Sequence, residues 1–487
     1  MVLSGWHRIP LKINNYNEMK KLLQIVSVFL LGTLVSQAQW QPDVLLTNDP
    51  GNSQMDGLPN ARCITSSGDT VHIAWRDYRD GISGEIYYKR STDGGLNWGP
   101  DIRISKNVFT STAPSISVSG SVVIIVWSDK RDGISNNNYE LYYSRSTDGG
   151  TSWGADTRLT NDAAQSDSPS VSVYGKLVLV VWDDYREVST KTYYKRSTDG
   201  GINWSPDTKL IEPGGSPSVS VSGSMVHVVW NALGKTSYKR SSDGGLSWQV
   251  SKLLTINNVI TNSPSLSVSG SSIHVVWLDS RNSSKYEIYY THSTDSGKTW
   301  EADTRLTTNY TSATLFSSVA ASGSDVHVVW DDNRDGNYEI YYKSSKDGGI
   351  SWGADTRLTS NAATSMHPFI SISASAVHVV WNDTRDGADV YYKRNLTGNP
   401  VGIKELAASD LKFTVFPNPA STEIKVKSLE NINELTITDI YGKEIYHSGI
   451  LNPSPEIRIP VSGFPAGIYF IQLKNETGKR AQKFIKL

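Results

Sequence analysis

Cysteine is almost absent from this chain of 487 residues, whose one thiol belongs to Cys63. A single cysteine excludes an intramolecular disulfide and a zinc site built from several thiolates. We expect Cys63 to be a buried, inert thiol. An excess of one charge is missing too, because 47 Lys and Arg stand against 48 Asp and Glu. A near-neutral, mildly acidic body argues against a nucleic-acid partner, which would select a basic surface.

Long apolar runs are also scarce. Residues 22–35 form one, and it is too short to span a bilayer comfortably. It follows Met19-Lys20-Lys21 and precedes Ser36-Gln37-Ala38, the pattern of a secretory signal peptide with its cleavage site. We therefore expect translation to start at Met19, residues 1–38 to form the leader, and the exported protein to begin at Gln39.

Tryptophan, in contrast, recurs at regular intervals. Each unit of about 50 residues holds four β-rich runs separated by turn residues, as at 218–222, 225–230, 236–240 and 248–255. Units of this size predict an all-β propeller of seven four-stranded blades over residues 39–398, with six blades as the alternative. The first tryptophan of each unit falls at Trp75, Trp127, Trp182, Trp230, Trp277, Trp330 and Trp381.

The two ends of the repeat region predict how the ring closes. The last unit has a third run at Val390–Arg394, but neither the Ser-x-Asp-x-Gly-x-x-Trp motif nor a fourth run follows it. Residues 43–49, at the other end, match the fourth-run residues 156–162. We expect residues 44–47 to pair with 390–394 and complete the last blade, because an unpaired sheet edge invites aggregation.

Six units carry Ser-x-Asp-x-Gly-x-x-Trp between their third and fourth runs. The carboxylate accepts backbone N–H bonds within the turn, and the glycine permits positive φ. These repeats resemble the Asp-box, or BNR, repeats of sialidase-like propellers, over residues 43 to about 395. The resemblance implies that the boxes lie on the rim, away from a catalytic face, and that their aspartates are structural: Asp93, Asp148, Asp199, Asp243, Asp295 and Asp347.

The opposite face is predicted to carry a second motif, Trp-x-Asp-x-Arg, which the fourth unit breaks with Asn231-Ala232-Leu233-Gly234. Arginines on one face are suited to bidentate binding of carboxylate or sulfate groups. The alternative is that each Asp pairs with an Arg of its own or a neighbouring blade and fixes the hairpin. The candidate ligand-binding residues are Asp77, Arg79, Asp129, Arg131, Asp184, Arg186, Asp279, Arg281, Asp332, Arg334, Asp383 and Arg385.

Other residues that suggest chemistry receive structural interpretations. His72 and four equivalents share one strand position in different blades, too far apart for one metal, and are expected to pack between blades. Tyr-Glu pairs such as Tyr139-Glu140 recur in several blades, and adjacent strand residues point to opposite faces, so we interpret these pairs as structural. The loops after the fourth runs, with Asp162 and Asp167, offer a general acid or ligands suited to Ca²⁺. We expect no other cofactor, and we nominate no catalytic residue.

The Asp/Trp pattern stops after Asn395, and residues 399–410 are expected to be a linker. Residues 411–487, with Phe413–Ala420, Pro465–Ile471 and a basic end, closely resemble the sorting domain of type IX secretion cargo, a small Ig-like β-sandwich. The resemblance implies passage through the periplasm of a Gram-negative bacterium with the help of the secretion machinery. It further implies removal of the tail and a final place at the cell surface or outside the cell.

Three functions are compatible with these features. The leading one is an exported module, expected to be a monomer, that binds glycan or a surface protein through its Asp/Arg-rich face. A sialidase-like glycoside hydrolase and a structural scaffold are the alternatives. Three unpaired arginines around a pocket would favour the hydrolase. Arginines all tied to repeat aspartates would favour a binding module or a scaffold.

Overall fold

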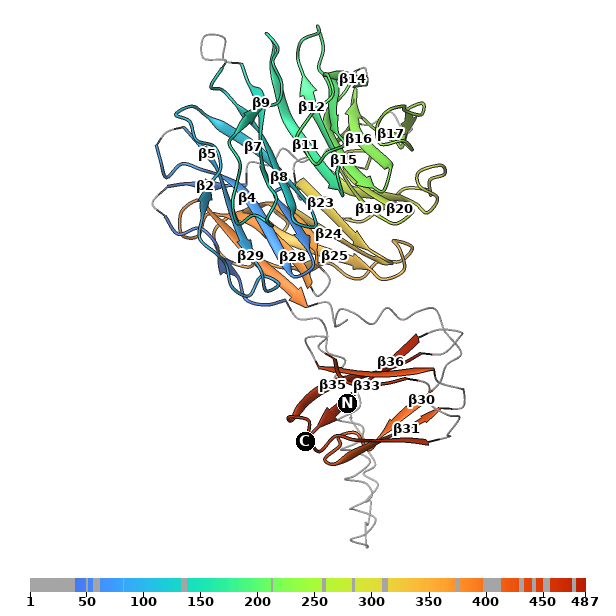
Figure 1. The fold of residues 1–487 in the computed structure, drawn as a ribbon. Helices are drawn as coiled ribbons and strands as arrows, with labels where there is room; N and C mark the ends of the chain where they lie inside the picture. The colour runs from blue at the N-terminus through green and yellow to red at the C-terminus, as the bar shows by residue number, and fades with distance from the viewer. Residues whose placement is uncertain are drawn as a thin grey trace, which may run out of the picture. The chain divides into compact units, whose positions relative to one another are not determined.

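The chain was analysed as a computed structural model, which describes residues 40–49, 51–55, 62–81, 83–132, 138–211, 213–255, 260–282, 285–308, 314–373, 376–396, 413–428, 433–439, 444–449, 456–474 and 479–487. The predicted leader and linker lie outside these residues. The chain separates into two compact units, residues 1–398 and 399–487. All regular elements of the described residues are strands (Figure 1). None of those residues forms an apolar helix of membrane-spanning length.

The described residues of the first unit form seven antiparallel sheets, called blades 1 to 7 in chain order. The innermost strands are β2 (Ser53–Gln54) and β3 (Ile64–Ser67) in blade 1, then β7 (Ser111–Ser119), β11 (Ser166–Tyr174), β15 (Gly215–Ser222), β19 (Thr261–Ser269), β23 (Thr314–Ser322) and β27 (Ser365–Ile372). The second strands are β4 (Thr70–Asp77), β8 (Val122–Asp129), β12 (Leu177–Asp184), β16 (Met225–Ala232), β20 (Ser272–Asp279), β24 (Asp325–Asp332) and β28 (Ala376–Asp383). The third strands are β5 (Glu85–Ser91), β9 (Glu140–Ser146), β13 (Lys191–Ser197), β17 (Lys235–Ser241), β21 (Glu287–Ser293), β25 (Glu339–Ser345) and β29 (Asp389–Leu396). The outermost strands are β6 (Ile102–Arg103), β10 (Thr157–Arg158), β14 (Thr208–Ile211), β18 (Lys252–Leu253), β22 (Thr304–Arg305), β26 (Thr356–Arg357) and β1 (Val44–Leu45).

The all-β propeller expectation is confirmed by the way these sheets meet. Each innermost strand packs against the next, from β3 to β7 and onward, and β27 packs back against β3. The outermost strands are shorter than the sequence predicts. In blade 4, Trp248 lies in the turn before β18, where its ring packs edge-on against Tyr194 of the preceding blade, so the strand begins only at Lys252.

The N-terminal strand closes the ring as expected. Val44 pairs with Tyr392 and Leu45 with Tyr391, and the Leu46 N–H donates to the Val390 carbonyl at 2.9 Å. In Figure 1 the blue N-terminal strands accordingly lie beside the orange strands β28 and β29. Blade 7 thus takes its outermost strand from residues more than 340 positions earlier.

Apolar cores fill the spaces between neighbouring blades. Between blades 1 and 2, for example, Tyr88 and Ile86 pack with Ile116, Val123 and Trp127, and all five side chains are buried. The second strands are apolar on both faces because both faces are covered. Cys63 is also fully buried, which confirms the expected burial of its thiol.

Serine side chains join the inner strands. The Ser115 hydroxyl of β7 accepts the Val171 N–H of β11 at 3.1 Å, and the Ser117 hydroxyl accepts the Val173 N–H at 3.1 Å. The same contacts link β11 to β15 through Ser170. The inner edge of a blade has no further strand to pair with, so these hydroxyls satisfy backbone donors that would otherwise stay unpaired.

Each Asp box closes its own turn and also clasps the preceding blade. Asp93 accepts the backbone N–H groups of Leu96 and Asn97 at 3.0 and 2.9 Å. Burial is the largest single influence and opposes ionisation, but these hydrogen bonds, together with those from the Ser91 and Asn97 side chains, outweigh it and lower the pKa of Asp93 to about 2. Trp98 of the same box packs edge-on against Tyr392 of blade 7, with ring centroids 4.9 Å apart. The box therefore links two blades as well as two strands.

Five repeated histidines lie on the second strands, next to the tyrosines at these contacts between blades. Each Nδ1 lies 2.6–2.8 Å from the hydroxyl of a third-strand tyrosine in its own blade. Four of these tyrosine hydroxyls occupy the space that a Cβ would fill on the motif glycine of the next blade's Asp box, at Gly95, Gly150, Gly297 and Gly349. Burial lowers the pKa of these histidines to about 3 or 4, so they are neutral at pH 7: His72, His227, His274, His327 and His378.

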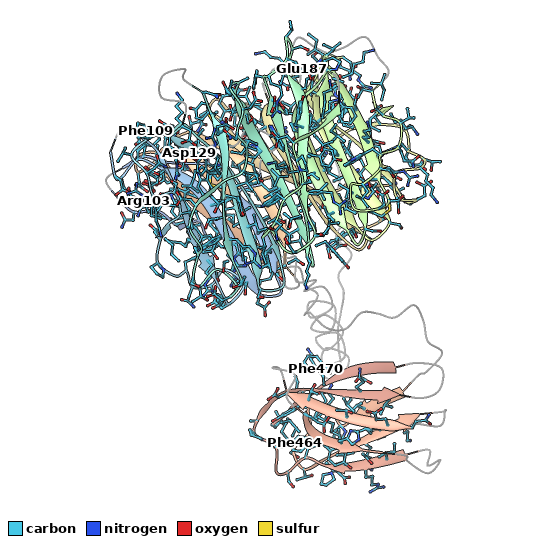
Figure 2. The ribbon with its side chains drawn as sticks, turned by 45° about the horizontal axis from the view of Figure 1, so that its top comes forward. Arg103, Phe109, Asp129, Glu187, Phe464 and Phe470 are labelled. Atoms are coloured by element: carbon cyan, nitrogen blue, oxygen red, sulfur yellow. The ribbon has the colours of Figure 1, made fainter. Side chains whose placement is uncertain are left out.

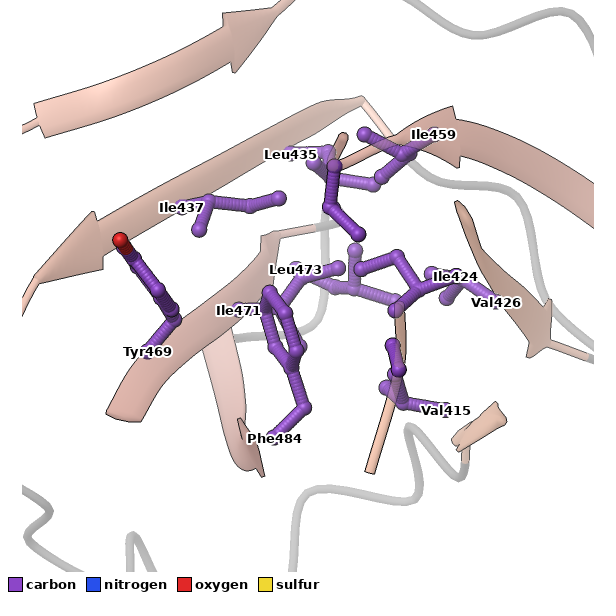
Figure 3. Close-up of a cluster of buried hydrophobic side chains, with 12 residues drawn as sticks. Val415, Ile424, Val426, Leu435, Ile437, Ile459, Tyr469, Ile471, Leu473 and Phe484 are labelled. Carbon is purple, nitrogen blue, oxygen red and sulfur yellow. The ribbon is translucent and has the colours of Figure 1, made fainter. Parts of the chain in front are cut away.

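The second unit is a small two-sheet domain. Its first sheet holds β30 (Phe413–Phe416), β31 (Glu423–Ser428) and β34 (Glu456–Pro460). Its second holds β33 (Glu444–Ser448), β32 (Glu434–Asp439), β35 (Gly467–Lys474) and β36 (Lys479–Lys486). Apolar side chains of both sheets, among them Ile424, Leu435, Ile471 and Phe484, form one buried core (Figure 3).

Candidate functional site at the channel mouth

The Trp-x-Asp-x-Arg motif forms a repeated ion pair on the face that carries the loops between second and third strands. Arg79 donates to both carboxylate oxygens of Asp77 at 2.9 and 2.6 Å, and to Asp101 at 2.8 Å. Its guanidinium lies 4.3 Å above the centroid of the Tyr87 ring. The other arginines and their two carboxylate partners are Arg131 with Asp129 and Asp156, Arg186 with Asp184 and Asp207, Arg281 with Asp279 and Asp303, Arg334 with Asp332 and Asp355, and Arg385 with Asp383 and Asp43.

These pairs lie within single blades. The second carboxylate comes from the segment before each blade's outermost strand, so one arginine ties the second, third and outermost strands together. The paired Asp129, labelled in Figure 2, is fully buried, and its Oδ2 also accepts the indole N–H of Trp127 at 2.9 Å. The six repeat arginines thus already have carboxylate partners in the molecule.

The residue between Trp and Asp differs around the ring and lies nearer the axis. Its side chain meets the first residues of the next blade's innermost strand. Asp183 accepts the Ser216 N–H at 3.0 Å, and Asp331 accepts the His367 N–H at 3.1 Å. We call this set the channel-mouth ring, made of Arg76, Ser128, Asp183, Asn231, Leu278, Asp331 and Asn382.

The innermost strands are bulged where they meet the ring. Five non-glycine residues there adopt positive φ of 51–59°, each directly before a proline: Ala113, Ser168, Ser216, Ser263 and His367. The strand registers shift at the same places. Such backbone costs about 1–3 kcal/mol and tends to cluster at functional sites. Sequence reasoning missed these bulges, although the proline that recurs near the start of five innermost strands was a usable signal.

Asp183 is the most perturbed carboxyl of the ring. Burial raises its pKa to about 8, the hydrogen bond from the Ser216 N–H opposes this, and the charge of Asp167 adds to it. The carboxyl of Asp183 is therefore mostly protonated at pH 7. Tyr185 lies beside it with 44% of its surface exposed, and its pKa is raised by burial and by the same two carboxyls.

A second centre lies between blades 6 and 7. Asp331 is fully buried and accepts the N–H groups of Leu315, Phe316 and His367 at 2.9–3.1 Å. Burial raises its pKa to about 6 despite these hydrogen bonds. The His367 ring packs edge-on against Phe316, with centroids 4.1 Å apart, and its Nδ1 lies 3.3 Å from the Asn382 amide.

Three tyrosines lie on consecutive blades of the same face, and we call them the tyrosine arc: Tyr78, Tyr139 and Tyr185. Tyr78 and Tyr139 are half-buried. The Arg76 guanidinium lies 4.5 Å above the Tyr78 ring, and the Lys130 ammonium 4.7 Å above the Tyr139 ring.

Hydrogen-bonding groups lie between these tyrosines. The Ser128 hydroxyl donates to Asp167 at 2.6 Å, and the Gln165 amide donates to the same carboxylate at 2.9 Å. Asp167 was expected from the loop pattern, whereas the arc itself was not. Tyr139 and its neighbour Glu140 do not act as a pair, because Glu140 is buried against Thr160 and Arg158.

The acidic loops do not gather around one point in the described residues. Asp49 pairs with Arg79 at 2.7 Å, and Asp162 lies 3.5 Å from Arg186. Across the part of the chain that the structure describes, no group of three or more His, Cys, Asp or Glu side chains is arranged to hold a metal ion.

Comparison with known families identifies both parts of the chain. Residues 414–487 match the secretion system C-terminal sorting domain, and residues 195–206 match the BNR/Asp-box repeat. The chain thus joins a propeller that carries Asp-box repeats to a segment that matches a secretion sorting domain. That domain directs the Asp-box propeller through type IX secretion to the surface or the exterior of a Gram-negative bacterium.

Comparison with solved structures finds similar chains at low sequence identity. An ulvan lyase, which is a polysaccharide lyase, is 10% identical over 72% of this chain and 95% of its own, with a TM-score of 0.53. A protein of unknown function from Dyadobacter fermentans is 14% identical over 59% of this chain and 94% of its own, with a TM-score of 0.45. A Hadza microbial sialidase is 13% identical over 70% of this chain and 75% of its own, with a TM-score of 0.42. No curated protein matches the Asp-box propeller chain.

Proposed function

We propose that this protein is an exported carbohydrate-binding propeller that takes its ligand at the channel mouth, on the tyrosine arc of blades 1 to 3. One observation carries the proposal. The position after each first tryptophan varies from blade to blade, and so does the position two residues further on, which holds Tyr78 and Tyr185, while the Asp and Arg beside them repeat in six blades. Tyr139 stands before a third strand, a position where tyrosine recurs in blades 5 and 6, and it only adds a ring between the two variable tyrosines. A scaffold repeats its residues, whereas a single site needs different residues on different blades.

The chemistry of the arc suits a sugar. Tyrosine rings offer flat apolar faces for the C–H groups of a pyranose, and their hydroxyls offer hydrogen bonds. Gln165 and Asp167 are partly exposed on blade 3, where they can donate to and accept from sugar hydroxyls, and the buried Ser128 hydroxyl holds the Asp167 carboxylate in place. A carbohydrate ligand is also in keeping with the fold that the propeller shares with an ulvan lyase.

The Asp/Arg pairs take a supporting role in this proposal. Their guanidiniums are each held by two carboxylates and stacked on a tyrosine, so ligand binding there would have to break buried ion pairs. A sialidase-like hydrolase would need three unpaired arginines around one pocket. The pairing of all six repeat arginines therefore supports a binding module over that enzyme.

A second candidate is a carbohydrate-cleaving enzyme, which Asp183 favours. Its carboxyl is protonated near neutral pH and lies beside the exposed Tyr185, as a general acid requires. Product release from any bound oligosaccharide that stops in Asp183→Asn would support this candidate. Binding without turnover would leave the protein as a binding module.

The test uses the exported chain, a glycan array and calorimetry on the best ligand. Tyr185→Ala should weaken carbohydrate binding at least tenfold, because stacking of one ring is lost. The control is Tyr174→Ala, which removes a tyrosine of 52% exposure at the opposite end of strand β11. The proposal fails if no carbohydrate binds, or if both variants bind like the wild type.

A further inference from the structure

Arg62 holds an unusual place in the ring, just before strand β3 of blade 1. Its backbone is fixed to blade 2, because its carbonyl accepts the Ile116 N–H at 2.7 Å and its N–H lies 3.5 Å from the Ser115 hydroxyl. Its side chain goes elsewhere, and Nη2 donates to the Leu266 carbonyl of β19 at 2.6 Å. Blades 1 and 5 are not neighbours in the ring, so the side chain reaches across the ring axis to the innermost strand of blade 5.

The level of this crossing is close to the mouth. Cys63 and Ser115 occupy equivalent positions in blades 1 and 2. The Cys63 carbonyl accepts the Ala74 N–H, and Ser115 pairs with Val126, the residue of blade 2 that corresponds to Ala74. Ser115 lies directly after the mouth bulge of blade 2, so Cys63 lies at the corresponding level of blade 1. A group bound at the tyrosine arc would therefore meet the Arg62 guanidinium at the start of the channel.

Arg62 differs from the repeat arginines in having no acid to neutralise it. Among the described residues its side-chain acceptor is the Leu266 carbonyl, and no carboxylate contacts the guanidinium. A carbonyl carries only a partial charge, and most of the five N–H donors of a guanidinium remain for another acceptor. The side chain retains partial solvent access. Burial lowers its pKa to about 10, so it stays protonated at neutral pH.

We propose that the channel at Arg62 is an anion site, which receives the carboxylate or sulfate group of an acidic carbohydrate seated on the tyrosine arc. This inference rests on the proposed function and adds the ligand's charge to it. A planar guanidinium in a partly desolvated channel is well suited to bidentate binding of such groups. The fixed backbone of Arg62 holds the fork in place before the anion arrives.

The first test uses inorganic sulfate, titrated into the exported chain at constant ionic strength with chloride as the reference anion. Sulfate should bind the wild type and raise its thermal midpoint. Arg62→Gln should lose at least tenfold in sulfate affinity, and Arg62→Lys should fall between the two, because the charge remains and the fork is lost. Arg103→Gln, a charge change on the rim, should bind sulfate like the wild type.

The second test decides whether the anion belongs to a carbohydrate. Oligogalacturonate and its neutral methyl ester present the same sugar with and without charge. The wild type should prefer the acid at least tenfold, and Arg62→Gln should lose this preference while keeping its affinity for the ester. Equal preference in both proteins, with sulfate binding dependent on Arg62, would assign the site to a free oxyanion.

The two proposals fail in different ways. Sulfate binding that is unchanged in both Arg62 variants overturns the anion site, whatever the carbohydrates do. Sulfate binding that depends on Arg62, in a protein that binds no carbohydrate, keeps the anion site and overturns the proposed function. Circular dichroism of each variant without anion verifies the fold, and Arg62→Lys serves if Arg62→Gln does not fold.

Discussion

The clasp between Asp boxes and neighbouring blades makes a sharp prediction at Gly349. This glycine has a φ of +92°, and a Cβ there would overlap the hydroxyl of Tyr290 from the preceding blade and lie 2.7 Å from its Cε1. Tyr290 is 1% exposed, and its hydroxyl is hydrogen-bonded to Nδ1 of His274 at 2.8 Å, so the ring has no free space into which it could move. Gly348 is the matched control, because its φ is +77° and nothing lies within 4 Å of its Cβ position.

The two substitutions to alanine separate backbone strain from steric overlap. Positive φ costs alanine about 1–2 kcal/mol at either position. At Gly349 overpacking adds about 1–3 kcal/mol, and a weakened hydrogen bond of Tyr290 adds about 1 kcal/mol. We therefore expect Gly348→Ala to lower the free energy of unfolding by about 1–2 kcal/mol and Gly349→Ala by about 3–6 kcal/mol.

Guanidinium chloride unfolding of the exported chain measures these losses. Tyr290→Phe removes the hydroxyl that overlaps the new methyl group, so the double variant should be less destabilised than the sum of the single variants by at least about 1 kcal/mol. Equal losses for the two glycines, or strict additivity with Tyr290→Phe, would refute the clasp as the cause.

Three further predictions concern pH, ring closure and export. Because burial raises the pKa of Asp183 to about 8, the wild type should lose stability as the pH rises from about 4 to 8. Denaturant midpoints measured against pH should show this loss in the wild type and not in Asp183→Asn. Parallel midpoint curves for the two proteins would argue against a buried neutral carboxyl. Leu46 lies on the segment that closes the ring and is 4% exposed, so Leu46→Ala should lower the free energy of unfolding by about 2–5 kcal/mol. Val44 is 40% exposed, so Val44→Ala should lower it by less than about 0.5 kcal/mol. Similar losses would mean that ring closure does not depend on the packing of Leu46. A chain ending at residue 410 should stay inside the cell envelope in fractionation, and its arrival at the surface would contradict a sorting role for residues 414–487.

Much of the fold could be predicted because its information is local. Strand runs, Asp-box turns and the tryptophan period all depend on residues within one unit, and each unit repeats them. Even closure was predictable, since residues 43–49 carry the text of an outermost strand. The pairing of Arg79 with Asp77 is local as well. Its second partner, Asp101, needs the blade to form and was not expected.

The candidate site is different, because it is made by the ring rather than by any blade. Asp183 is one variable residue among many until blade 4 brings the Ser216 N–H to it and burial raises its pKa. Arg62 shows the same limit, since its contact with Leu266 joins residues 204 positions apart. The spacing of residues along the chain determines which strands and turns form, because those elements depend on interactions between residues only a few positions apart. Only closure of seven blades around an axis decides which side chains share the mouth and how much water they keep.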